Sequence, residues 1–119
     1  MPSPPELHTW REREVIDADG EALGHAEDVY ADDRTGEPVF LLVRGGRFGM
    51  RLHFVPIEGA AIEGDKIRVA HRLEQVNSAP HISADEHLSR GEEERLFEHY
   101  GMEAPAGEAS VLVVWVGSV

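Results

Sequence analysis

A chain of 119 residues with a formal net charge of −12 is long enough for one domain, and its acidic surface would repel nucleic-acid phosphates. It contains no cysteine, which excludes disulfides and thiolate metal sites. The longest apolar run, Val111 to Val116, is far shorter than the ~20 residues that cross a bilayer, and residues 1–6 lack the features of a signal peptide. We therefore expect a soluble, cytoplasmic protein that neither binds nucleic acid nor inserts into a membrane.

Residues 1–12 are predicted to form a flexible lead-in, because they hold three prolines and few apolar groups. Trp10 is the exception, and we expect it to cap one end of the core rather than to bind a ligand. A short strand is predicted at 14–17. The Asp19-Gly20 pair that follows is typical of a tight hairpin turn.

The next two segments define the predicted sheet. Apolar positions between Leu23 and Ala31 follow neither the strand period nor the helical one, and a strand with a bulge near Gly24 reconciles them. The run from Val39 to Val43 is continuously apolar, rich in β-branched and aromatic residues, and bounded by turn signals. Such a run indicates a strand that is buried on both faces.

Further short strands are predicted at 52–57, 60–62 and 66–69, the first with apolar groups on both faces. The glycine-rich segment 45–49 is interpreted as a hairpin turn, because the Lys-Ser/Thr pair and the helix of a phosphate-binding loop do not follow it. Six short strands separated by turns predict a mainly β fold. We expect a small antiparallel six-stranded barrel that occupies residues 13–82.

A C-terminal extension, 83–119, is predicted to hold one helix and one strand. Ser89 and Glu92 have the spacing of a capping box, which predicts a helix over 89–100. The terminal strand is predicted at 110–116 from its β-branched composition. The apolar stripe of the helix consists of Leu96, Phe97 and Tyr100.

Several short motifs occur in a fixed order along the chain. They are Asp19-Gly20, Leu23-Gly24, Glu27-Asp28-Val29-Tyr30, Asp32-Asp33-Arg34-Thr35-Gly36, the buried strand, Phe54-Val55-Pro56, Gln75-Val76 and Ala79-Pro80. This set resembles the PRC-barrel domain, a family named for the H subunit of the photosynthetic reaction centre. The helix with Glu92-Glu93-Glu94 and Tyr100-Gly101 resembles the segment that follows the barrel in many stand-alone members.

The resemblance implies a small PRC-type β-barrel of six strands. It also implies an assembly function, because members of this family mostly act as interaction modules, and free-standing members often dimerise. The family has no known catalytic residues, so the resemblance implies none here. The chain lacks both the membrane helix of the H subunit and the N-terminal domain of the ribosome-maturation factor that carries such a barrel.

The sequence contains no nucleophile elbow, and its carboxylate pairs occur only through abundance, so we predict neither an enzyme nor a cofactor. A zinc site would need three or four converging ligands, and no two histidines share one element at ligand spacing. We interpret them as scattered surface groups, which could make an interface sensitive to pH. The seven histidines are His8, His25, His53, His71, His81, His87 and His99.

Our hypothesis is a non-enzymatic interaction and assembly module, a homodimer that also binds a further protein partner. The alternative is a ligand- or metal-sensing regulatory module on the same barrel. The terminal strand, uncharged and free of proline, would aggregate unless paired. We favour its exchange with the partner subunit over pairing within its own barrel. The predicted interface residues are Arg47, Phe48 and Arg51 around the central hairpin, and Val113 and Trp115 in the terminal strand.

Overall fold

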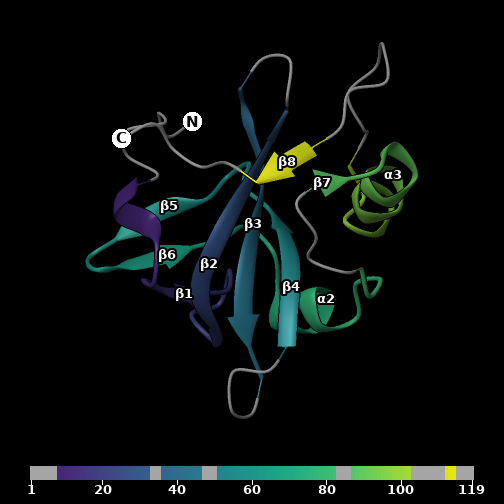
Figure 1. Cartoon of the computed structure of the whole chain (residues 1–119). Helices are drawn as coiled ribbons and strands as arrows, with labels where there is room; N and C mark the ends of the chain where they lie inside the picture. The colour runs from purple at the N-terminus through teal and green to yellow at the C-terminus, as the bar shows by residue number, and fades with distance from the viewer. Residues whose placement is uncertain (1–7, 33–35, 47–50, 83–86, 103–111, 115–119) are drawn as a thin grey trace.

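The computed structural model describes residues 8–32, 36–46, 51–82, 87–102 and 112–114, and shows a mainly β fold with two α-helices in these ranges (Figure 1). No helix in the described ranges is long and apolar enough to cross a membrane. The elements in chain order are the 3₁₀ helix η1 (His8–Trp10), β1 (Glu14–Ile16), β2 (Ala22–Asp32), β3 (Pro38–Gly45), β4 (Arg51–Pro56), β5 (Ala61–Glu63), β6 (Lys66–Arg68), α2 (Leu73–Asn77), β7 (His87–Leu88), α3 (Arg90–His99) and β8 (Leu112–Val114).

The described strands form one sheet whose main path runs β4-β3-β2-β1-β6-β5. Neighbours on this path are antiparallel except β1 and β6, which are parallel, with Val15 opposite Ile67. The prediction of a closed, wholly antiparallel barrel is therefore wrong on two points, because the sheet is open and mixed. At the β4 end of the path, α2 packs against the strand and the Tyr100 hydroxyl donates to the Phe54 carbonyl oxygen, so segments that follow the sheet border β4 where a closed barrel would have β5.

The long hairpin of β2 and β3 forms the centre of the sheet (Figure 1). The predicted buried strand is confirmed, because Phe40, Leu41, Leu42 and Val43 are all buried in the core. The two strands approach closely where Gly24 faces β3, since a Cβ on Gly24 would lie 2.1 Å from the carbonyl oxygen of Arg44. The register of β2 also shifts where it pairs with β1 beside Gly24, which confirms the predicted bulge.

The start of the chain contributes to the core through Trp10, which is 2% exposed. This confirms the expectation that Trp10 caps the core, and it makes part of the predicted flexible lead-in a packed element. The indole Nε1 of Trp10 is buried without a hydrogen-bond partner.

A single carboxylate joins the β1–β2 turn to α2. Asp17 is buried, and its Oδ1 accepts hydrogen bonds from the backbone N–H of Asp19 at 2.8 Å and of Glu21 at 2.7 Å. Its Oδ2 accepts one from the backbone N–H of Leu73, the first residue of α2, at 2.7 Å. Asp17 therefore caps a helix that lies more than fifty residues further along the chain.

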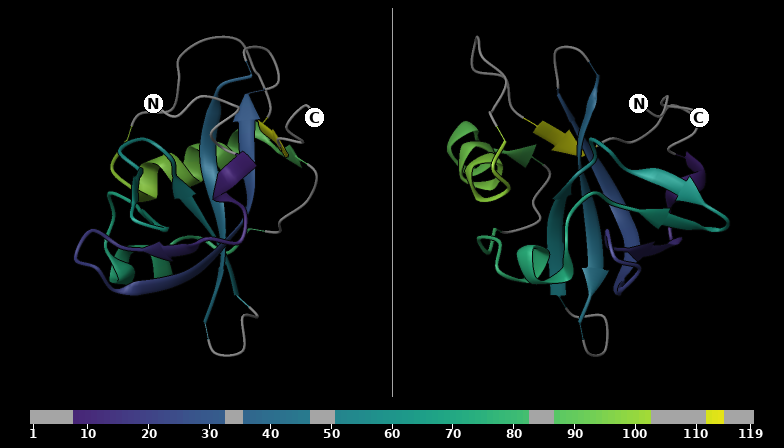
Figure 2. Two further views of the ribbon diagram at one scale, coloured as in Figure 1. Left: turned by 90° about the vertical axis from the view of Figure 1, so that its left-hand side faces the viewer. Right: turned by 180° about the vertical axis from the view of Figure 1, so that it is seen from behind.

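Helix α3 begins with the predicted capping box. The hydroxyl of Ser89 accepts from the Glu92 backbone N–H, and the Glu92 carboxylate accepts from the Ser89 backbone N–H. The predicted apolar stripe is confirmed as well, because Leu96, Phe97 and Tyr100 are buried in the same core as the sheet. Figure 2 shows α3 beside β7, on the side of the sheet away from the β5–β6 hairpin.

Strand β8 pairs with the end of β2, where Ala31 lies opposite Val113, and with β7. The predicted terminal strand is thus present at Leu112–Val114, where it pairs with β2 and β7 of the same chain.

Candidate functional site

The structure places only part of the predicted interface. Arg47, Phe48 and Trp115 lie outside the described residues. Arg51 is exposed at the start of β4, opposite Gly45, and Val113 is the middle residue of β8. Because β8 pairs with β2 and β7, the described backbone does not bring Arg51 and Val113 together on paired strands.

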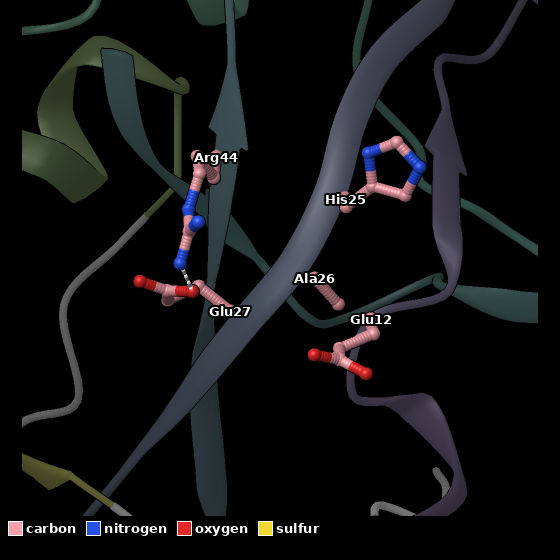
Figure 3. A pocket seen from close by; sticks show the side chains of 5 residues that line it. All are labelled: Glu12, His25, Ala26, Glu27 and Arg44. Atoms are coloured by element: carbon pink, nitrogen blue, oxygen red, sulfur yellow. Dashed lines mark hydrogen bonds and ion pairs between the residues drawn. The ribbon is translucent and has the colours of Figure 1, made fainter. Parts of the chain in front are cut away.

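A concave surface that the sequence analysis did not identify lies over β2. It is a cleft of about 260 Å³ lined by Glu12, His25, Ala26, Glu27 and Arg44. Figure 3 shows Glu12 and Glu27 on either side of Ala26, with Arg44 beside Glu27 and His25 further along β2. Three of the five residues are consecutive in β2, so this strand forms the centre of the cleft.

The pairing register of β1, β2 and β3 determines which residues lie beside His25 in the cleft. His25 of β2 lies opposite Arg44 of β3 and opposite Glu14 of β1. Cross-strand neighbours on one face of a sheet are close enough to interact. A sequence pattern alone does not reveal this arrangement, because it depends on which residues the bulges of β2 bring into register.

The backbone of Glu12 fixes the other side of the cleft. Glu12 has φ 66°, the one positive φ of a non-glycine residue in the described chain, and its N–H donates to the Ala26 carbonyl oxygen at 2.8 Å. The N–H of Ala26 donates in return to the carbonyl oxygen of Arg13 at 2.9 Å. These two bonds hold Glu12 against β2, although the left-handed backbone conformation is unfavourable for a residue that carries a Cβ.

Charges in and near the cleft are mostly paired. Arg44 forms an ion pair with Glu27, and Arg11 Nη2 lies 3.0 Å from Asp28 Oδ1. Burial raises the pKa of the Asp28 carboxyl, and the positive charge of Arg11 offsets part of this rise. Glu12 has no ion-pair partner among the residues that the structure describes.

A second polar surface surrounds β4 and α2. Burial lowers the pKa of the His53 imidazole on β4, and the positive charges of Arg51 and His81 lower it further. At the middle of α2, His99 Nε2 lies 2.7 Å from the Gln75 carbonyl oxygen, and His71 Nδ1 lies 3.2 Å from Gln75 Oε1.

The histidines do not assemble into a metal centre in the described part of the chain. No three histidine, aspartate or glutamate side chains converge there as ligands. The side chains of His8 and His87 lie outside the description.

The open sheet, with helices against one side and a shallow polar cleft over its central strand, defines a small, mainly β protein module. The PRC-barrel domain model matches residues 6–75, which is more than half of the chain. The chain therefore belongs to the PRC-barrel domain family, as the order of its motifs indicates. No curated protein matches the chain.

Proposed function

We propose that this PRC-barrel protein is a non-enzymatic interaction module that forms a homodimer through the edge of β5. The observation that carries the proposal is the exposure of all three residues of β5 at the end of an open sheet. Ile62, in the middle of the strand, is 43% exposed. An edge strand with an exposed apolar side chain offers backbone hydrogen bonds and apolar area to an added strand.

The opposite edge of the sheet is less accessible. Helix α2 packs against β4, and the hydroxyl of Tyr100 binds the carbonyl oxygen of Phe54 in that strand. Among the described residues, the exposed large apolar side chains are Leu52 on β4 and Ile62 on β5. On the main path of the described sheet, β4 is thus covered in its second half, whereas β5 is exposed at every residue, which supports the choice of β5.

Charge near β5 is compatible with self-pairing in spite of the acidic surface. Arg68 binds Glu63 through two of its three guanidinium nitrogens, with Nε–Oε2 at 2.5 Å and Nη2–Oε1 at 2.7 Å. In an antiparallel pair of β5 strands centred on Ile62, Glu63 of one copy faces Ala61 of the other rather than a second carboxylate. Like charges are therefore not placed directly opposite one another.

Light scattering on three purified chains tests the proposal. The wild type is expected to be a dimer and Ile62→Lys a monomer, because a lysine in the centre of the interface brings two positive charges together. Leu52→Lys is the matched control, with the same change at an exposed apolar residue of β4, the opposite end of the main path, and is expected to remain a dimer. A monomeric wild type would contradict the homodimer, and a dimeric Ile62→Lys would show that the interface lies elsewhere.

A sensing module is the alternative, and the proximity of His53 and His81 favours it. Two imidazoles can provide part of a metal site, which requires further ligands. Native mass spectrometry with zinc and then a chelator tests this alternative. A stoichiometric zinc that is lost together with the dimer would support metal sensing, and an unchanged mass would contradict it.

A further inference from the structure

The cleft over β2 combines a small apolar floor with one carboxylate, that of Glu12, which has no ion-pair partner in the described part of the chain. Ala26, at its centre, is buried, whereas the charged side chains stand around it. Among the lining residues, Glu27 and Arg44 neutralise one another, and Glu12 contributes a further negative charge. Apart from His25, the lining of the cleft contains two carboxylates and one cation.

The backbone of Glu12 is held in position beside the cleft. Two hydrogen bonds between residues 12–13 and Ala26 fix the backbone on which Glu12 stands. They place Glu12 at the rim of the cleft, where its side chain is exposed to solvent. Glu12 therefore differs from most other carboxylates of the acidic surface in its place beside a cleft.

We propose that this cleft binds a basic side chain, an arginine or a lysine, presented by a partner protein. The cationic end would pair with Glu12 beside the Glu27–Arg44 ion pair, and the aliphatic stem would lie over Ala26. Arginine and lysine combine an apolar stem with a charged end, which matches a floor and rim of this kind. The inference rests on the proposed interaction function and gives that function a recognition site distinct from the β5 edge.

The charges favour a cation over an anionic ligand. The guanidinium of Arg44, which would attract a phosphate or a carboxylate, is already paired with Glu27. An anion in the cleft would also face Glu12 and the potential of a chain with a net charge of −12. A basic side chain would instead be attracted by Glu12 and by the net negative charge of the chain.

An NMR titration tests the proposal with a blocked Gly-Arg-Gly peptide, its lysine analogue, and a control in which citrulline replaces arginine. Citrulline keeps the shape of arginine and removes the charge. Saturable shifts of the backbone amides of residues 25–27 are expected with the arginine or lysine peptide and not with the citrulline peptide. Equal shifts with citrulline, shifts spread over the whole acidic surface, or saturable shifts of these amides with inorganic phosphate alone would overturn the proposal.

Two substitutions with the same change in net charge locate the binding group. Glu12→Gln is expected to weaken binding of the basic peptide about tenfold, because it replaces a charge-assisted contact with a neutral one. Glu98→Gln is the control, since Glu98 is exposed on α3 and has no ion pair in the described chain, and it is expected to leave the affinity unchanged. Unchanged affinity in Glu12→Gln would refute the assignment.

The peptide titration can be interpreted independently of the dimer test. It requires neither self-association nor a complete partner. If the cleft amides shift in a protein that is monomeric, the site for a basic side chain is supported and only the β5 homodimer is contradicted. If the protein is a dimer and its cleft amides do not shift, the β5 interface is supported and the site for a basic side chain is contradicted.

Discussion

Tyr100 donates a 2.7 Å hydrogen bond from its hydroxyl to the backbone carbonyl oxygen of Phe54, and this bond joins the end of α3 to the edge of β4. Burial raises the pKa of the Tyr100 hydroxyl, so the group stays protonated and able to donate at neutral pH. His71 and His99 pack against the Tyr100 ring, with ring centroids 4.7 Å and 5.1 Å away. The C-terminal helix is thereby fixed to the family domain at a defined point.

Tyr100→Phe should destabilise the protein by about 1–3 kcal/mol, because it leaves the buried Phe54 carbonyl oxygen without its donor. The ring and its contacts are kept, so the lost stability is the contribution of the hydroxyl alone. Urea unfolding measures the change in the free energy of unfolding. An unchanged midpoint would mean that water replaces the hydroxyl and that the edge of β4 is accessible to solvent.

The Asp17 carboxylate should make stability depend on pH in the acid range. Burial alone would raise the pKa of Asp17, but the hydrogen bonds from the backbone N–H groups of Leu73, Glu21 and Asp19 outweigh it, and the pKa lies below its usual value. The unfolded chain therefore binds a proton first as the pH falls. The stabilisation by Asp17 is complete above the unfolded pKa of about 4 and is lost as the pH falls through the folded pKa.

Asp17→Asn tests this because asparagine keeps the size of the side chain and removes the titration. We expect about 2–4 kcal/mol lower stability at pH 7, since one carboxylate accepts three backbone donors. The difference between the variant and the wild type should shrink below pH 4. Equal melting temperatures at neutral pH would contradict the role of Asp17 as the cap of α2.

The register of β2 and β3 depends on the absence of a side chain at Gly24. Its φ is +142°, and a Cβ there would overlap the backbone of Arg44 and Gly45. Gly24→Ala should therefore cost at least about 3 kcal/mol or prevent folding. Gly91→Ala in α3 is the control, because nothing lies within 4 Å of its Cβ position, and it should stabilise the protein by up to about 1 kcal/mol. Comparable melting temperatures for both variants would disprove the close approach.

His53 should give a second pH dependence, at higher pH. Its folded pKa lies below the usual value of about 6.5, first through burial and then through Arg51 and His81. The unfolded state then takes up a proton before the folded state, so the free energy of unfolding should fall as the pH drops below 6.5 toward the folded pKa. His53→Gln should remove this part of the profile, and an identical profile from pH 5 to 8 would contradict it.

Local signals in the sequence predict the local parts of this structure. The buried run of β3, the bulge beside Gly24 and the capping box at Ser89 each follow from residues that are close together in the chain. The family match also agrees with the motif order. These features depend on backbone preferences and short spacings, which sequence patterns record directly.

The long-range parts could not be predicted in the same way. The parallel pairing of Val15 with Ile67 and the capping of Leu73 by Asp17 join residues that are more than fifty positions apart. The cleft is also a product of register, and the left-handed backbone of Glu12 has no sequence signal because glutamate rarely adopts it. The open sheet with one parallel pair results from such long-range contacts. The alternation of apolar and polar residues within short strands is the same in an open sheet and in a closed barrel, so it does not distinguish them.

The terminal strand could pair within its own chain or with a partner subunit, and a deletion distinguishes these two pairings. In the structure β8 pairs with the residues of β2 from Tyr30 to Asp32 and with β7 of the same chain. Deleting residues 110–119 should then lower the free energy of unfolding by about 1–3 kcal/mol, because several strand hydrogen bonds are lost. The oligomeric mass should stay the same, since the β5 edge is untouched. Light scattering and urea unfolding on the shortened chain measure both quantities, with Ile62→Lys as the reference for a disrupted dimer. If the deletion alone converts a dimer into a soluble monomer, β8 is exchanged between subunits and the intrachain pairing is wrong.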